Sequence, residues 1–203
     1  MAFQFKTSSC VVAGTFNTYV FQPDWLIRNE LVPKDCEILV ETNIGHPGMR
    51  LSAVSLPVRW LVLPTGITIE TEDEGTNCGE IISRVVDILK HTPLQAIANN
   101  TMFQAPVSEP SVSAVYDCFE RMQLPSNVSI KTKGVAFAVM HGDTQFNLSV
   151  FLSDDAVLIG TNAHTPLPAP APEKAAAVAR SFFEHRSFAK RMLADLFRAE
   201  FAG

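Results

Sequence analysis

The residues best suited to acid–base chemistry lie in the last third of the chain. His141 and Asp143 flank Gly142, and a histidine beside an aspartate can share a proton in a cleft. His164 follows the predicted strand at 157–160 and could join a site with Asp143 or Cys78. The same unit is also a tight hairpin signal, in which Gly142 and Asp143 only form the turn. Both interpretations stay open, and His141, Asp143 and His164 are the candidate catalytic residues.

The sequence gives little support for a metal site or a nucleotide-binding site. A metal needs three or four converging ligands, and the chain has no HxxxH or CxxC pair. Ser8-Ser9-Cys10 and Ser153-Asp154-Asp155 contain nucleophile and acid types without the context of a catalytic elbow or triad. The glycines form neither a P-loop nor a dinucleotide fingerprint. We therefore expect no metal and no cofactor.

Two adjacent amides, Asn99 and Asn100, interrupt an apolar segment that reads as a strand. A buried amide without hydrogen-bond partners costs about 1–3 kcal/mol, so each must be satisfied. In a structural interpretation one asparagine faces water and the other ties down a neighbouring loop. In a functional interpretation the pair is a polar anchor in a binding groove. Asn99 and Asn100 are therefore the candidate binding residues.

The composition bounds the class of protein. The chain of 203 residues has 47% hydrophobic and 18% charged residues and a net charge of −5. Low charge with many apolar residues excludes intrinsic disorder and suggests that a partner or another copy covers some apolar surface. Proteins that bind phosphate backbones are usually basic, so nucleic-acid binding is not expected.

The location follows from similar observations. The first ten residues lack the charged and apolar regions of a signal peptide, and no apolar run is long enough to span a membrane. The four cysteines are widely spaced, as expected for reduced structural thiols; they are Cys10, Cys36, Cys78 and Cys118. We expect a cytoplasmic protein without membrane contact.

The hydrophobic patterns predict a single α+β domain over residues 1–203. Alternation such as Ile67-Thr68-Ile69-Glu70 is typical of an antiparallel sheet with one solvated face. We expect about six to eight strands, with helices packed mainly on one face and a long C-terminal helix. The predicted strands span 3–14, 17–21, 37–42, 50–54, 58–63, 67–71, 94–103, 128–140, 144–152 and 157–160. One predicted helix follows Pro23, a second begins near Thr76 or Asn77, and a third covers about 109–122. After a Pro-rich linker at 166–172, residues 173–201 close the chain as one long helix or two in sequence.

From about residue 66 onward, the order of elements resembles a broad family of uncharacterised bacterial proteins. The matching pieces are the helix Ile81–Leu89, the strand Leu94–Asn100, and the segment Phe183–Phe197 with His185. The family's basic residue before the asparagine is Ala98 here. The architecture is also similar to that of SecB-type export chaperones, which pack helices on one face of an antiparallel sheet. The resemblance implies no catalytic residues.

Two functions remain as hypotheses. The first is a non-enzymatic protein- or peptide-binding or assembly protein, acting as a homo-oligomer or with a protein partner. A sheet face or strand edge would then accept an extended peptide. The second is a small cytoplasmic enzyme that uses His141, Asp143 and His164 in a cleft, which requires at least two of them to meet beside a pocket.

Overall fold

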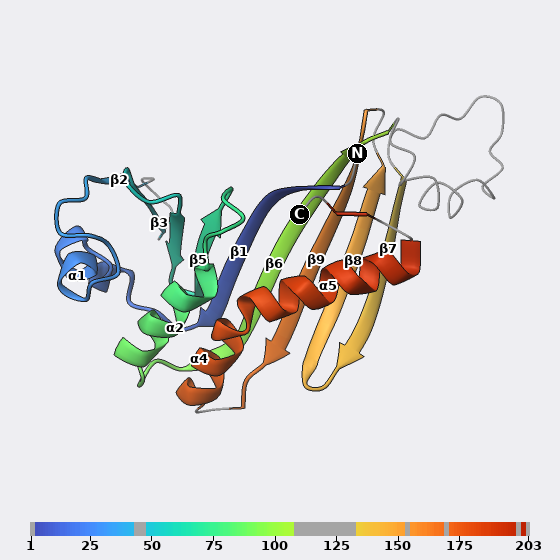
Figure 1. Cartoon of the computed structure of the whole chain (residues 1–203). Helices are drawn as coiled ribbons and strands as arrows, with labels where there is room; N and C mark the ends of the chain where they lie inside the picture. The colour runs from blue at the N-terminus through green and yellow to red at the C-terminus, as the bar shows by residue number, and fades with distance from the viewer. Residues whose placement is uncertain are drawn as a thin grey trace, which may run out of the picture.

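A nine-stranded antiparallel sheet dominates the fold (Figure 1). The computed structural model describes residues 3–42, 48–107, 133–152, 155–168, 171–197 and 200–201. The strand order is β2-β3-β4-β5-β1-β6-β9-β8-β7. The strands are β1 (Gln4–Gly14), β2 (Ile38–Thr42), β3 (Met49–Ala53), β4 (Arg59–Leu63), β5 (Gly66–Thr71), β6 (Leu94–Pro106), β7 (Lys133–His141), β8 (Thr144–Leu152) and β9 (Ala156–Pro166).

The helices of the described residues lie on one face of this sheet, as Figure 1 shows, with α5 crossing β6, β9, β8 and β7. They are α1 (Pro23–Arg28), α2 (Cys78–Ile88), α4 (Pro172–Arg180) and α5 (Phe182–Phe197), with a short 3-10 turn, η1 (Thr18–Val20). The antiparallel α+β class with helices on one face is thereby confirmed. We call the opposite face of the sheet the open face.

Strict alternation along the strands separates the two faces. In β5, Ile67 and Ile69 are fully buried under the helices, whereas Thr68 and Glu70 are half-buried on the open face. The buried side chains form two apolar clusters. One lies beneath α1, α2 and α4 and contains Trp60. The other lies beneath α5 and contains Phe103 and Phe146. Both cores therefore lie between the sheet and the helices.

Helix α2 begins where its sequence signals predict. The Asn77 side chain accepts a hydrogen bond from the Glu80 backbone N–H at 3.2 Å, which satisfies one of the free amides of the first turn. The helix is buried on the side that includes Ile82, Val85 and Val86. Its position against β1 and β5 follows from this apolar stripe.

Several predicted elements differ from the structure. The described residues already form nine strands of the sheet, rather than six to eight. Residues 18–20 form a 3-10 turn instead of a strand, because Asn17 accepts a hydrogen bond from the Tyr19 N–H and caps the turn. Strand β9 runs to Pro166, through His164 and the first residue assigned to the linker. The predicted helix over 109–122 lies outside the described residues.

The C-terminal helix is two helices. The backbone leaves the helix at Ser181, and α5 ends at Phe197 rather than continuing to residue 201. Phe201 instead forms a parallel bridge with Phe3 at the start of β1. No helix in the described ranges is long and apolar enough to cross a membrane.

Candidate functional site

Asn99 and Asn100 project to opposite faces of the sheet, because they are consecutive in β6. Asn99 points under the helices and is 5% exposed. Its Nδ2 lies 3.3 Å from the Val178 carbonyl oxygen and 2.8 Å from His185 Nδ1. Asn99 therefore connects strand β6 to both α4 and α5.

His185 is held as a neutral imidazole. Because Asn99 donates to Nδ1, the ring proton must be on Nε2. Burial lowers the pKa of His185, and the neighbouring His141 lowers it further, while Glu184 acts in the opposite direction. This contact fixes α5 on the sheet, and the lowered pKa favours the uncharged ring, with its one proton on Nε2.

Acidification from about pH 7.5 to about pH 5.5 should destabilise the wild-type protein more than a His185→Gln variant. The pKa of folded His185 lies below its ordinary value of 6.5. As the pH falls through that window, the unfolded state binds more protons and the free energy of unfolding decreases. Urea midpoints of both proteins at both pH values measure the effect, and an equal pH dependence would contradict this account.

Asn100 points to the open face and belongs to a row of hydrogen-bonded side chains across four strands. Asn100 Nδ2 donates to Ser9 Oγ at 3.0 Å, and Asn162 Nδ2 donates to Asn100 Oδ1 at 2.6 Å. Asn147 Nδ2 donates to Asn162 Oδ1 at 3.0 Å. Gln145 Nε2 donates to Asn147 Oδ1 at 2.6 Å. We call these five residues the amide row.

The register of the sheet creates this row. Ser9 pairs with Asn100, Asn100 with Asn162, and Asn162 with Asn147. Side chains directly opposite in an antiparallel pair lie about 4.5–5.5 Å apart, within reach of amide-to-amide hydrogen bonds. Each of the three asparagines uses one of its two N–H groups and one lone pair in the row. Each therefore retains a donor and an acceptor for a ligand.

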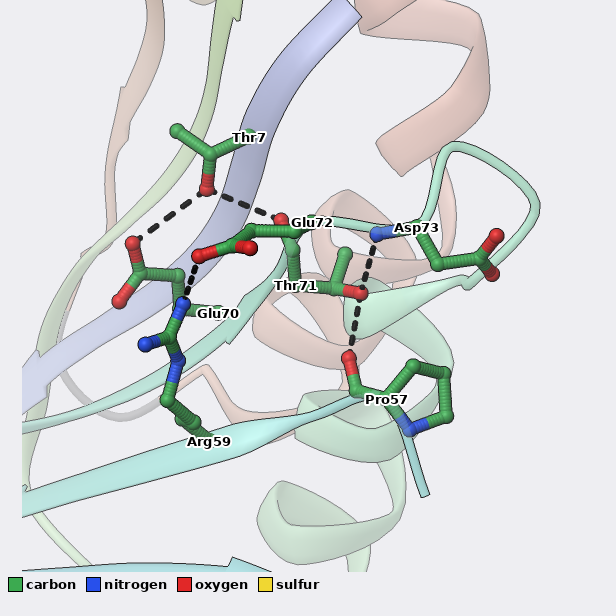
Figure 2. A network of polar contacts seen from close by, with 7 residues as sticks. All are labelled: Thr7, Pro57, Arg59, Glu70, Thr71, Glu72 and Asp73. Atoms are coloured by element: carbon green, nitrogen blue, oxygen red, sulfur yellow. Dashed lines mark hydrogen bonds and ion pairs between the residues drawn. The ribbon is translucent and has the colours of Figure 1, made fainter. Parts of the chain in front are cut away.

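A charged group continues the row beyond Ser9. Glu70 is the register partner of both Ser9 and Arg59. Figure 2 shows Arg59, which is ion-paired with Glu72, reaching toward the side chains of both acids. Thr7 Oγ1 lies 2.9 Å from the Thr71 carbonyl and 3.3 Å from Glu70 Oε1, so one hydroxyl proton serves both acceptors.

The ion pair itself adds little to stability. The side chains of Arg59 and Glu72 are 56% and 70% exposed, and such surface pairs contribute about 0–1 kcal/mol. Thr71, in contrast, is buried. It donates to the Pro57 carbonyl at 2.5 Å and accepts from the Asp73 N–H at 3.0 Å (Figure 2). The strand end is thus fixed by Thr71, while the charged side chains of Arg59 and Glu72 are exposed.

Two hollows meet at Glu70 on the open face. The first, of about 350 Å³, contains Ser9, Asn100, Asn162 and Asn147, and Gly160 at its floor leaves it without a side chain there. The second, of about 540 Å³, lies toward β3 and β4. It is lined by Glu41, Arg50, Ser52, Arg59, Trp60, Leu61, Thr68 and Glu70. The open face therefore has two adjoining hollows with Glu70 in the lining of both.

The three candidate catalytic residues lie in different places. His141 lies on the helix-covered face and stacks on Phe188, with ring centroids 4.4 Å apart. Asp143 is in the exposed β7–β8 turn and lies 2.7 Å from Lys174 Nζ. The hydrogen bond from Lys174 lowers the pKa of the Asp143 carboxyl, and the lysine charge adds to this.

His164 lies on the open face, between its register partners Ala98 and Gln145. In the described part of the chain no hydrogen bond joins any two of His141, Asp143 and His164, and neither hollow includes them. The turn interpretation describes Gly142 well, since its φ of 59° is the left-handed value that favours glycine.

The thiols of Cys10 and Cys78 are buried and free. Burial raises the pKa of Cys10 and raises that of Cys78 to about 12. A raised pKa favours the protonated thiol, which is a poor nucleophile. Within the described ranges, no group of three metal-ligating side chains was found. Cys118 and the residues Ser153-Asp154 lie outside those ranges.

Comparison with known proteins gives no further guide to this surface. No protein-family model matches the chain, and no curated protein matches it. The resemblance to the bacterial family and to SecB-type chaperones therefore stays a prediction.

The sequence alone pointed to Asn100 but not to Gln145, Asn147 or Asn162. All of the last three lie at alternating polar positions of strands, which gives a weak signal. That signal becomes specific only when the pairing of β6 with β9 and of β9 with β8 is known.

Proposed function

We propose that this chain is a non-enzymatic binding protein whose open face receives an extended segment of a partner protein. The observation that supports it most is the amide row, with its unused donors and acceptors beside a hollow of about 350 Å³. This role extends the hypothesis of a protein- or peptide-binding protein from an unspecified sheet face to named residues.

The asparagines of the amide row stabilise strands less well than β-branched residues would. Asparagine is depleted in strands, where β-branched residues pack better, yet Asn100, Asn162 and Asn147 occupy paired positions on three adjacent strands. The hydrogen bonds between them offset part of that cost, since cross-strand pairs contribute about 0.2–1 kcal/mol. Residues that oppose the local preference at several coupled positions are expected at functional sites.

A polypeptide fits the chemistry of the open face. Its backbone carries one donor and one acceptor per residue, as each asparagine of the row does. Apolar side chains also border the row: Met102 lines the first hollow, and Phe151 is 48% exposed on the same face. The acidic and basic residues at Glu70 and Arg59 balance one another, which disfavours a phosphate backbone.

The size of the row sets the length of the segment. The amide row together with Glu70 on β5 crosses five adjacent strands, from β5 to β8. Four spacings of about 4.8 Å amount to about 19 Å, which an extended chain covers in about six residues. We expect binding segments of about this length, with polar side chains that alternate with apolar ones.

Selection of a random peptide library on immobilised wild-type protein and on an Asn162→Val variant tests the proposal. Valine removes both hydrogen bonds of the central asparagine but suits a strand. We expect the variant to stay within about 1 kcal/mol of the wild-type stability and to lose the peptides that the wild type enriches. Gln104→Val, a similar change on the same face outside the row, should retain them.

The outcomes separate the alternatives. Equal enrichment by wild type and Asn162→Val would contradict the proposal. So would a variant that unfolds, since the row would then be structural. Binding of an oligosaccharide panel with no peptide enrichment would assign the row to another ligand class and equally overturn it.

A further inference from the structure

Among the described residues, β7 is an edge strand, and its own sequence lacks the features that usually protect an edge. It is the last strand of the sheet, and no described strand pairs with its outer side. Its register with β8 continues over nine residue pairs without a shift, and it contains no proline. Edge strands are normally shortened, bulged or given charges or prolines to prevent pairing with another chain.

The opposite edge shows the contrast. Strand β2 has only five residues, and Glu41 lies near its end. Between Gly134 and Met140, β7 carries no charge at all. On its helix side, Phe137 is 37% exposed and its ring lies 5.9 Å from that of Phe197. The apolar layer under the helices therefore ends at β7 with a phenylalanine ring that is partly exposed.

The five central residues of β7 read the same in both directions around Phe137. Residues 135–139 read Val-Ala-Phe-Ala-Val in both directions. In an antiparallel pair of two identical strands centred on Phe137, each Val135 would oppose Val139 of the second copy. Each Ala136 would oppose Ala138, and the two Phe137 rings would meet. Opposed residues share a face of the sheet. Val135, Phe137 and Val139 of both copies would therefore extend the apolar layer under the helices.

We propose that β7 pairs with β7 of a second copy of this chain, around a two-fold axis at Phe137. The two sheets then form one continuous sheet, with the helices of both copies on the same side. A two-fold interface must be self-complementary, and residues 135–139 place identical residue types opposite one another in such a pair. Binding of an unrelated peptide would not require β7 to read the same in both directions. The palindromic sequence therefore favours a second copy of this chain as the partner of β7.

The pairing leaves the open face free and does not depend on the proposed peptide binding. Light scattering on the full chain should give twice the chain mass. A variant with Ala136→Lys and Ala138→Lys places lysines opposite lysines across the axis, and like charges directly opposite one another destabilise a strand pair. We expect its dissociation constant to rise by at least about tenfold. Both alanines are exposed, so folding should be unaffected.

The matched control reverses one charge. With Ala136→Glu and Ala138→Lys, each glutamate would oppose a lysine of the other copy, and the dimer should persist. A monomeric wild type would overturn the proposal, as would a dimer that both double variants leave unchanged. Hydrogen exchange adds an independent measurement: amides of residues 134–140 should be protected in the dimer and exchange faster in the double-lysine variant.

Discussion

Replacing Gly79 by alanine should destabilise the protein by about 3 kcal/mol or more. A Cβ at this position would lie 1.9 Å from the Ala179 carbonyl oxygen and 2.6 Å from Phe182 Cβ. Helix α2 therefore approaches α4 too closely for any side chain. In an ordinary helix the same change stabilises by about 0.5–1 kcal/mol, so packing reverses the expected sign. Urea unfolding followed by circular dichroism measures it.

Gly75→Ala is the matched control, four residues earlier. The nearest atom to a Cβ there is Asp73 Oδ2 at 3.5 Å, which is ordinary contact. We expect its stability to lie within about 0.5 kcal/mol of wild type. If Gly79→Ala were as stable as Gly75→Ala, the close contact between α2 and α4 would be wrong. The hydrogen bond from Asn99 to the Val178 carbonyl would then also be contradicted, because it requires α4 to lie at this position.

Replacing Trp60 by alanine should cost about 3–5 kcal/mol, the range for truncating a buried tryptophan. Trp60 is 1% exposed in the core beneath α1 and α2. It also holds β4, which carries Arg59 and Leu61 to the second hollow of the open face. Loss of the ring should therefore weaken both the core and the charged end of the amide row. Thermal or urea denaturation gives the stability directly.

Trp60→Phe distinguishes volume from hydrogen bonding. The Trp60 Nε1 is buried without a hydrogen-bond partner in the described part of the chain, and phenylalanine removes that unpaired group together with part of the ring. We expect a cost clearly smaller than that of Trp60→Ala. A Phe variant as unstable as the Ala variant would indicate that the N–H has a partner that stabilises the fold.

The sequence predicted those parts of the fold that depend on local pattern. The alternation separated Ile67 and Ile69 from the solvated face, and the start of α2 was predicted at Thr76 or Asn77, of which Asn77 caps the helix. The length of β9 was not readable, because its open-face positions carry Gly160, Asn162 and His164, which resemble loop residues. Tertiary pairing with β6 and β8 overrides that local preference.

The candidate site was only half predictable for a similar reason. Adjacent amides must project to opposite faces of a strand, so the separate roles of Asn99 and Asn100 follow from local geometry. The partner of Asn100 is Asn162, which is 62 residues away. The partner of Asn99 is His185, which is 86 residues away. Contacts at this separation depend on strand order and helix placement, which residue types do not specify.

The most direct test of the open-face proposal is a nuclear magnetic resonance titration of the side-chain amides. The probe is the peptide pool enriched on the wild type. We predict that the side-chain NH₂ signals of Asn100, Asn147 and Asn162 shift together as peptide is added, while that of Asn99 under the helices does not. Shifts confined to β7, to Asn99 or to the helices would contradict the assignment of the open face as the binding surface.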